Sequence, residues 1–234
     1  MPAFEILSGS ALGSLLGMRH ALEPDHLTAV STLVTTVPGE GGRYRAAMLG
    51  AFWGLGHTLS LVVVGAVLVV LRAEMPARVS DVFELFVAIM LVGLGIRAIA
   101  LAVRQGRVGS AHVHHHGHVV HMHAGAAPHV HVGRWTLARR PLLVGAVHGL
   151  AGSGALTALV LATLTSTTAR ITYMALFGFG STLGMAVLSG LLGWPVARLG
   201  ANRTLARAVS LAVGCISIAF GLAWGYPLTS RLFL

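Results

Sequence analysis

The sequence is poor in charged residues, has one cysteine and has no lysine. Charged side chains make up 10% of its 234 residues, whereas a soluble domain of this size carries about 25%. The lone Cys215 excludes an internal disulfide and a dithiol relay. All 16 basic residues are arginines that fall between apolar runs and form no basic face, which excludes a nucleic-acid partner. These shortages indicate a polytopic membrane protein whose main partner is the lipid bilayer.

What the sequence has instead is six apolar segments, each at or above the roughly 20 residues that cross a bilayer core. A positively charged region is missing ahead of the first segment, so we interpret that segment as a retained span and not as a cleaved signal. A hydrophilic stretch between the third and fourth segments divides the chain into residues 1–104, 105–140 and 141–234. The predicted spans are residues 6–37, 46–71, 82–103, 141–164, 171–197 and 208–226.

The first and third parts resemble each other. Residues 54–59, Gly-Leu-Gly-His-Thr-Leu, return at an offset of 124 as residues 178–183, Gly-Phe-Gly-Ser-Thr-Leu, and His20-Ala-Leu returns at an offset of 128 as His148-Gly-Leu. Because each half has three spans, the second half must enter the membrane upside down relative to the first. The sequence therefore predicts an all-α integral membrane protein with six helices in two inverted three-helix repeats, and a site near the midplane.

The distribution of arginine predicts the orientation. If the spans alternate, ten of the arginines fall on one side of the membrane and four on the other. Because cytoplasmic loops are enriched in arginine, both termini are expected outside and residues 105–140 in the cytoplasm.

Residues 19–26, Arg-His-Ala-Leu-Glu-Pro-Asp-His, place several ionisable side chains inside the first span. A charge at mid-membrane costs about 2.5–3.5 kcal/mol, so such a cluster indicates a functional site. On a regular helix His20 and His26 would lie about 120° apart. Pro24 predicts a break that lets the two imidazoles and Asp25 face one centre. In the fourth span, the glycines at positions 149, 152 and 154 predict a second break, at Gly149–Gly154, that corresponds to the break at Pro24.

Imidazole and carboxylate groups suit nickel, cobalt and zinc, whereas the lack of cysteine at the site argues against copper(I). His57, between a glycine and a threonine in the second span, is a further candidate ligand. A packed core histidine is the alternative for His57, and an Arg19–Glu23 ion pair is the alternative for Glu23. His148 is interpreted as a further ligand, a supporting partner or a relic of the repeat. The candidate metal residues are His20, Glu23, Asp25, His26, His57 and His148.

Nine of the 13 histidines lie in the hydrophilic stretch. A flexible tract of imidazoles offers many weak sites for divalent transition metals, so we interpret it as a cytoplasmic metal buffer. A disordered spacer without a specific role is the alternative. The tract contains His112, His114, His115, His116, His118, His121, His123, His129 and His131.

The motif His20-x4-Asp25-His26, together with Gly-His57-Thr, resembles the nickel/cobalt transporter (NiCoT/NicO) family. Residues 148–153 and 177–184 are similar to its short, UreH-type (urease accessory) branch. The chain departs from the usual family pattern at Glu23, where aspartate is more common. Histidine-rich loops also occur in efflux members, which leaves the direction of transport open.

The resemblance implies a permease and not an enzyme, with Ni²⁺ or Co²⁺ as transported substrate and no prosthetic group. It implies a place in the plasma (inner) membrane of a prokaryote, with a cytoplasmic metallochaperone or urease-maturation proteins as candidate partners. The residues that match the signature, and so are implied to bind the ion in transit, are His20, Asp25, His26 and His57.

Two other functions stay open from the sequence. An intramembrane metalloenzyme is disfavoured because the chain lacks His-Glu-x-x-His and has few intramembrane histidines. An exporter of another small solute, with a regulatory histidine-rich loop, would not need His20 and His26. Neither the coupling ion nor the oligomeric state follows from the sequence.

Overall fold

The computed structural model describes most of the chain, and the described part is mainly helical. The described residues are 12–35, 42–71, 73–105, 112–116, 119–123, 130–132, 135–137, 139–164, 166–199 and 202–233. The helices are a segment at residues 12–20, α2 (Pro24–Thr35), α3 (Gly42–Leu71), α4 (Ala77–Gln105), α5 (Arg139–Thr163), α6 (Thr167–Leu199) and α7 (Arg203–Phe233).

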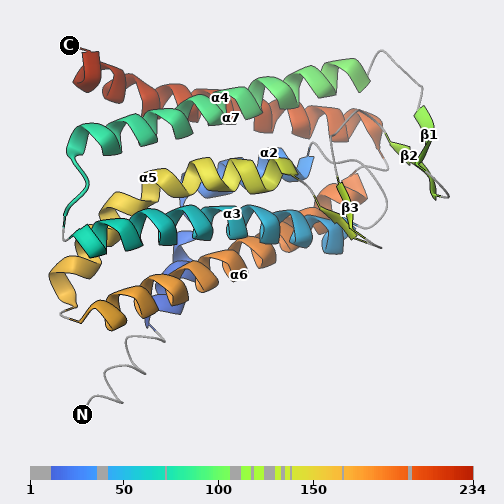
Figure 1. Ribbon diagram of the computed structural model, residues 1–234. Helices are drawn as coiled ribbons and strands as arrows, with labels where there is room; N and C mark the ends of the chain where they lie inside the picture. Colours follow the sequence, from blue (N-terminus) through green and yellow to red (C-terminus); the bar gives the residue numbers. More distant parts are fainter. Residues whose placement is uncertain are drawn as a thin grey trace.

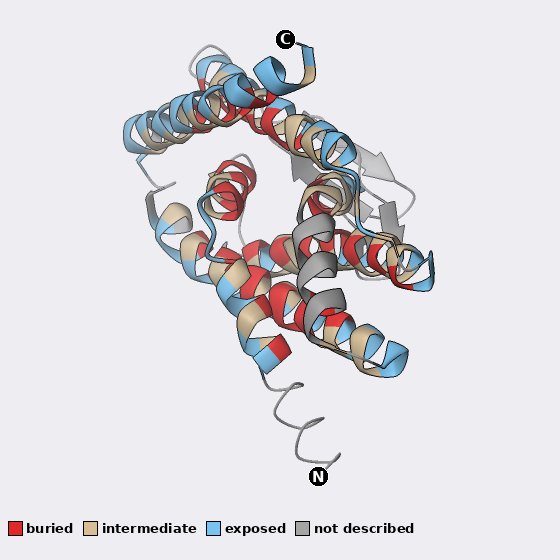
Figure 2. Cartoon of the chain, turned by 90° about the vertical axis from the view of Figure 1, so that its left-hand side faces the viewer, coloured by how far each residue is buried: buried red, intermediate tan, exposed pale blue. Residues whose placement is uncertain are grey.

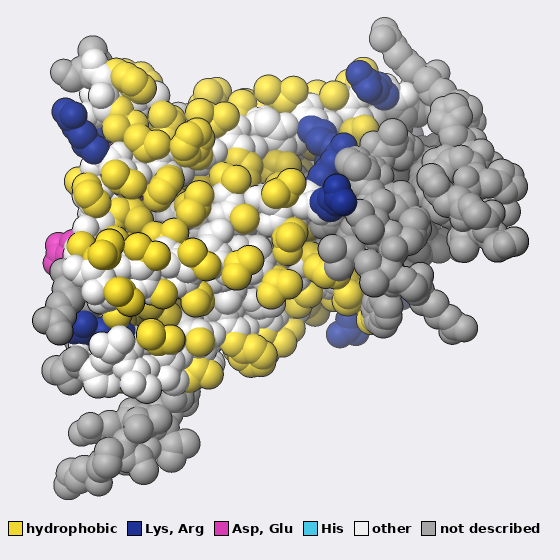
Figure 3. Space-filling view, viewed as in Figure 1, with side chains coloured by type: hydrophobic (Ala, Val, Ile, Leu, Met, Phe, Trp, Pro, Cys, Tyr) yellow, Lys and Arg dark blue, Asp and Glu magenta, His cyan; other side chains and the backbone are white. Residues whose placement is uncertain are grey.

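Four of these helices, α3, α4, α6 and α7, are long and apolar enough to cross a membrane, with at most 39% of their most apolar windows buried inside the protein. Apolar side chains left outside a bundle are stable in lipid rather than in water. Hydrophobic side chains cover the face seen in Figure 3, and arginines lie near both ends of the helices. The chain is therefore an integral membrane protein.

The helices form two close pairs with α2 and α5 between them (Figures 1 and 2). One pair is α3 with α6, and the other is α4 with α7. Buried residues line the sides of the helices that face each other (Figure 2). The larger buried apolar cluster includes Trp53, Leu91 and Met185, from three different helices.

Glycines set the close contact between α3 and α6. A Cβ added to Gly54 would lie 2.6 Å from the Thr182 Cα, and one added to Gly178 would meet the side chain of Thr58. Thr58 Oγ1 donates to the Gly178 carbonyl at 2.7 Å and lies 2.8 Å from Thr182 Oγ1. Gly54 contacts Thr182, whereas Thr58, farther along α3, contacts Gly178, which is earlier in α6. The two helices are therefore antiparallel. Small residues that let backbones approach are the usual basis of helix packing in lipid.

The pair formed by α4 and α7 has the same reciprocal pattern. A Cβ on Gly95 would lie 2.6 Å from the Gly214 carbonyl oxygen, and one on Gly221 would lie 2.7 Å from the Ala88 carbonyl oxygen. Midway between these contacts, the buried Ser217 hydroxyl donates to the Leu91 carbonyl at 2.7 Å. This pair is also antiparallel.

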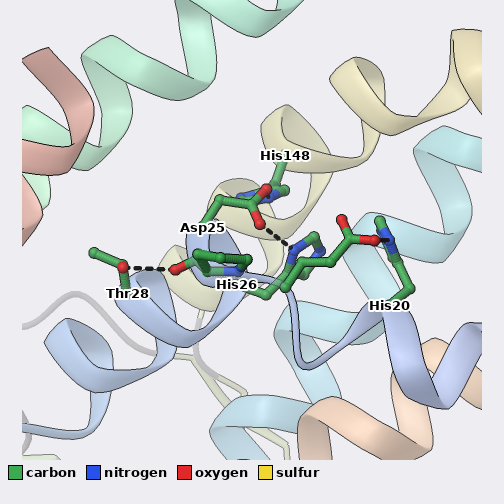
Figure 4. A network of polar contacts seen from close by, with 7 residues as sticks. His20, Asp25, His26, Thr28 and His148 are labelled. Atoms are coloured by element: carbon green, nitrogen blue, oxygen red, sulfur yellow. Dashed lines mark hydrogen bonds and ion pairs between the residues drawn. The ribbon is translucent and has the colours of Figure 1, made fainter. Parts of the chain in front are cut away.

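The break in the first span occurs where Pro24 predicts it. The segment 12–20 ends in a tight turn in which Leu22 N–H donates to the Arg19 carbonyl at 2.9 Å and Glu23 N–H to the His20 carbonyl at 3.0 Å. Pro24, which has no N–H to continue the ladder, opens α2, a position where proline is well tolerated. The Thr28 hydroxyl donates back to the Pro24 carbonyl at 2.6 Å (Figure 4).

The second predicted break is wrong, because α5 runs without interruption through Gly149–Gly154. Glycine permits a break but does not force one, and the helix contains no proline beyond its first turn. At Gly149 the missing side chain is used for packing: a Cβ there would lie against the His57 backbone.

The histidine-rich stretch differs from the expected flexible tract and from an all-α fold. It contains β1 (His112–His116) paired antiparallel with β2 (Val119–His123), and β3 (Val130–Val132) paired antiparallel with β4 (Trp135–Leu137). In the first hairpin His112 lies opposite His123 and His114 opposite His121. Valines between the histidines favour an extended backbone. The predicted buffer residues His118 and His129 lie outside the described residues.

Candidate metal centre

The break brings together four histidines from four helical segments. His20 ends the segment 12–20, His26 lies in the first turns of α2, His57 lies in the middle of α3, and His148 lies in α5. The His26 ring centroid is 4.4 Å from that of His20, 5.2 Å from that of His57 and 4.2 Å from that of His148. The ring of His26 is therefore the centre of the cluster (Figure 4).

These polar groups are buried deeply. His57 is 0% exposed, and His26 and His148 are each 1% exposed. The side chain of His20 is 15% exposed, whereas that of Glu23 is 53% exposed. Burying so many polar groups without a ligand is costly, so the arrangement favours a binding site over simple packing.

Two carboxylates orient three of the imidazoles. Asp25 accepts hydrogen bonds from His26 Nδ1 at 3.0 Å and from His148 Nε2 at 2.8 Å, so it lies between the two rings (Figure 4). Glu23 accepts from His20 Nδ1 at 2.9 Å. This contact replaces the Arg19–Glu23 pair considered above as the alternative for Glu23. A carboxylate that holds one ring nitrogen is the usual support of a metal-binding histidine, because it sets the ring orientation and directs the other nitrogen to the ion.

The opposite ring nitrogens have no hydrogen-bond partner within the described part of the chain. They are Nε2 of His20, Nε2 of His26 and Nδ1 of His148. Both ring nitrogens of His57 lack a partner as well, and all of these atoms are buried. Buried polar atoms without partners are rare and costly in native proteins. His20, His26 and His57 each offer a potential ligand atom, and these atoms lie within 4.8 Å of one another. A small shift of the side chains would bring all three to metal-binding distance, about 2.0–2.1 Å from one ion.

A second, overlapping group consists of Asp25, His26 and His148, whose potential ligand atoms also lie within 4.8 Å of one another. Asp25 thus lies beside the three-histidine group and not among its ligands. All six predicted intramembrane residues are brought into one cluster, whereas the loop histidines stay a prediction.

Two aromatic rings lie beside the histidines, one from Trp53 and one from Phe177, the first residue of the motif at residues 177–184. The Trp53 ring lies 5.4 Å from His26 and 5.7 Å from His148, and the Phe177 ring lies 5.3 Å from His20. Trp53 and Phe177 are separated by 124 residues, the offset of the repeat. Trp53 is the residue of the pair that the sequence motifs do not include, although it precedes Gly54 as Phe177 precedes Gly178.

We expect Asp25→Asn to lower metal affinity about 10–100-fold, the usual effect of losing the partner of a metal-binding histidine. Asparagine keeps the size of the side chain but loses its charge and one of its two acceptor oxygens, so it cannot accept from both His26 and His148. Nickel binding to the purified protein, titrated by calorimetry, would measure the change. An unchanged affinity would show that Asp25 does not support the ligands.

The chain is similar to known proteins over nearly its whole length. A family model described as NicO, high-affinity nickel-transport protein, matches residues 7–225. The chain is 32% identical over 236 aligned positions to the urease accessory protein UreH of Bacillus sp. (strain TB-90), covering 100% of this chain and 98% of that protein. No solved structure matches the chain significantly.

Proposed function

The chain belongs to the NicO family of high-affinity nickel-transport proteins, and on that premise we propose that it moves Ni²⁺, with Co²⁺ as the next choice, through the histidine cluster at the broken helix. It is a membrane transporter and not an enzyme, and the metal is its substrate. The observation that carries the proposal is the set of unpartnered imidazole nitrogens of His20, His26 and His57, two of them on rings held by carboxylates.

The donor set supports a divalent transition metal over Mg²⁺, Ca²⁺ and Cu⁺. Neutral imidazoles suit Ni²⁺, Co²⁺ and Zn²⁺, whereas Mg²⁺ and Ca²⁺ require oxygen ligands and Cu⁺ favours thiolate or thioether sulfur. Cys215, the single cysteine, is exposed on α7. The choice of nickel rests on the family match.

We also propose that six spans cross the membrane, as two inverted repeats in residues 1–104 and 141–234 joined by the cytoplasmic residues 105–140. Helix directions support alternating spans. The contacts of Gly145 with Trp53 and of Gly149 with His57 make α3 and α5 parallel, as the second and fourth spans must be. In alternating spans the second and fifth run in opposite directions, as do the third and sixth. The antiparallel pairs α3–α6 and α4–α7 agree with this.

Matching contacts in the two halves support the repeat. A Cβ on Gly145 would lie against the Trp53 carbonyl oxygen, and one on Gly17 would lie against the Phe177 carbonyl oxygen. Gly17 and Gly145 differ by 128 residues, and Trp53 and Phe177 by 124, the two offsets found in the sequence. A two-fold relation between the halves explains why the contact occurs twice.

The histidine-rich stretch and the similarity to a urease accessory protein support a proposal for the destination of the transported nickel. With the orientation that the arginines predict, residues 105–140 and the histidines of β1 and β2 face the cytoplasm of a prokaryotic cell. The similar protein from Bacillus is a urease accessory protein by name. We propose that the transporter supplies nickel for urease maturation, and that the stretch buffers the ion before a metallochaperone or maturation protein receives it.

We expect deletion of residues 112–131 to leave transport in place but to change metal sensitivity or apparent affinity. The deletion removes the histidine hairpin and leaves the broken helix and its cluster untouched. Growth at graded nickel concentrations, with nickel uptake measured in parallel, would check it. A deletion variant that reaches the membrane but moves no metal would contradict a buffering role.

Radioactive nickel movement in sealed vesicles tests the proposed function. Wild type is compared with the double variant His20→Ala/His26→Ala, with cobalt and zinc as competitors and an imposed proton gradient. Movement that is lost in the variant, with no organic substrate present, supports the permease and reveals its direction. No movement by folded wild type would favour an intramembrane metalloenzyme, and normal movement by the variant would favour an exporter that does not use these histidines.

A further inference from the structure

We infer that the centre holds one metal ion at two alternating positions that share His26: an outer position formed by His20, His26 and His57, and an inner position formed by Asp25, His26 and His148. This inference rests on the proposed function and adds a transfer step to it. The two groups of potential ligands overlap in one residue, and in each group the ligand atoms lie within 4.8 Å of one another.

His26 can serve both positions because its two ring nitrogens differ in their surroundings. Its Nε2 has no partner in the described part of the chain and is available to the outer group, whereas Nδ1 is held by Asp25 Oδ1 at 3.0 Å. The rings of His20 and His148 lie 4.4 and 4.2 Å from the ring of His26. An ion that moves from the Nε2 side of His26 to its Nδ1 side therefore exchanges His20 and His57 for Asp25 and His148.

At the inner position the ion takes the place of the two hydrogen-bonding protons around Asp25. His26 binds through Nδ1 and His148 through Nε2. Each ring gives the proton on the nitrogen that binds to water that accompanies the ion, and takes up a proton from that water at its other nitrogen, His26 Nε2 or His148 Nδ1. Both of these nitrogens are buried and lack a partner within the described residues. Each histidine keeps one proton throughout, so the exchange of tautomers balances without net release of a proton.

Only one position is filled at a time. Occupation of both would place a divalent ion on each nitrogen of one imidazole ring, which requires loss of its last proton and brings two double charges together in a medium of low dielectric. Repulsion between the positions favours departure of the first ion when the second arrives. A cation bound tightly at a single site would leave slowly. A second position with a similar number of ligands lowers the free-energy barrier to its departure.

His20 is the most exposed of the candidate ligands. Its side chain is 15% exposed and is held by Glu23, whose side chain is 53% exposed, whereas the side chains of Asp25 and His148 are 11% and 2% exposed. The part of the centre nearest the surface is therefore the end of the outer position at His20. His148 becomes a metal ligand in transit under this assignment, and not a relic of the repeat.

The test uses the full-length chain in nanodiscs and in vesicles, with Ni²⁺ or Co²⁺ alone as probe. The variants are His57→Ala for the outer position, His148→Gln for the inner position and both together. Glutamine keeps an N–H donor for Asp25 but is a poor metal ligand, so it separates a ligand role from a structural one. We expect each single variant to bind one ion per chain, with an altered Co²⁺ absorption spectrum, and to transport at least ten-fold more slowly than wild type. The double variant should bind none.

Wild-type transport by His148→Gln, or a Co²⁺ spectrum that does not differ between His57→Ala and His148→Gln, would overturn the inner position. Binding of two ions per chain by wild type would overturn alternation. Either result leaves the proposed function standing if His57→Ala is defective. Failure of the proposed function would look different, because wild type itself would then bind and move no nickel.

Discussion

Replacement of His26 by alanine should abolish nickel transport while the protein still folds and reaches the membrane. His26 is the one histidine found in both groups of potential ligands, and its ring lies within 4.2–5.2 Å of the rings of His20, His57 and His148. Loss of a residue that only supports a ligand costs about 10–100-fold, so loss of the central ligand should cost about 100-fold or more. Radioactive nickel flux into sealed vesicles, normalised to the amount of protein inserted, gives the measurement.

The matched control is Ser217→Ala. Ser217, like His26, is a buried polar residue, but it donates to the Leu91 carbonyl at 2.7 Å and belongs to neither group of potential metal ligands. Its loss should cost about 1 kcal/mol of stability, the typical value for one hydrogen bond, and leave the flux per folded molecule near that of wild type. Normal flux through His26→Ala would rule out the site. Equal loss in both variants would show that the assay reports folding and not metal binding.

The two halves of the molecule share packing but not ligands. Ser181 is the repeat counterpart of His57, and it is buried with no partner for its hydroxyl in the described part of the chain. A serine hydroxyl is a weak ligand for Ni²⁺ compared with an imidazole. His148 is the one histidine of residues 141–234, and it joins the same cluster as His20, His26 and His57. The candidate ligands in the described part of the chain therefore form one centre and not two.

The sequence could predict the break in the first span but not the continuity of α5. Proline removes a backbone donor and collides with the preceding turn, so Pro24 has few alternatives to opening a new helix. A run of glycines has no such constraint. Whether Gly149 loosens α5 or lets it approach α3 depends on the neighbouring helix, and in the fold its missing side chain accommodates the His57 backbone.

The residues that cluster at the candidate site could be predicted from the sequence, whereas the contacts that orient them could not. His20, Asp25 and His26 are marked by ionisable groups in an apolar span, which is a local property of the sequence. Which nitrogen faces the centre depends on which carboxylate holds the other one. Glu23 is three residues from His20, but the contact between Asp25 and His148 spans 123 residues and required the tertiary structure.

The packing that holds the cluster should be very sensitive to a single methyl group at Gly145. A Cβ there would lie against the Trp53 carbonyl oxygen and 2.8 Å from the Trp53 carbonyl carbon. Backbone atoms cannot rotate away as a side chain can, so α5 would have to move from α3. We expect Gly145→Ala to destabilise the protein by about 3 kcal/mol, the upper end for overpacking a well-packed interior. Thermal unfolding in detergent, followed by size-exclusion chromatography, measures the loss.

Gly93→Ala is the matched control, because it makes the same chemical change in a helix of the same bundle. A Cβ at Gly93 meets nothing within 4 Å, and alanine favours a helix over glycine by about 1 kcal/mol. This variant should unfold at the wild-type temperature or slightly above it. Because Trp53 packs 5.4 Å from His26 and 5.7 Å from His148, Gly145→Ala should also lower nickel flux per folded molecule, whereas Gly93→Ala should not. If the two variants unfolded at the same temperature, the close approach of α3 and α5 would be wrong, and with it the means by which His148 reaches Asp25.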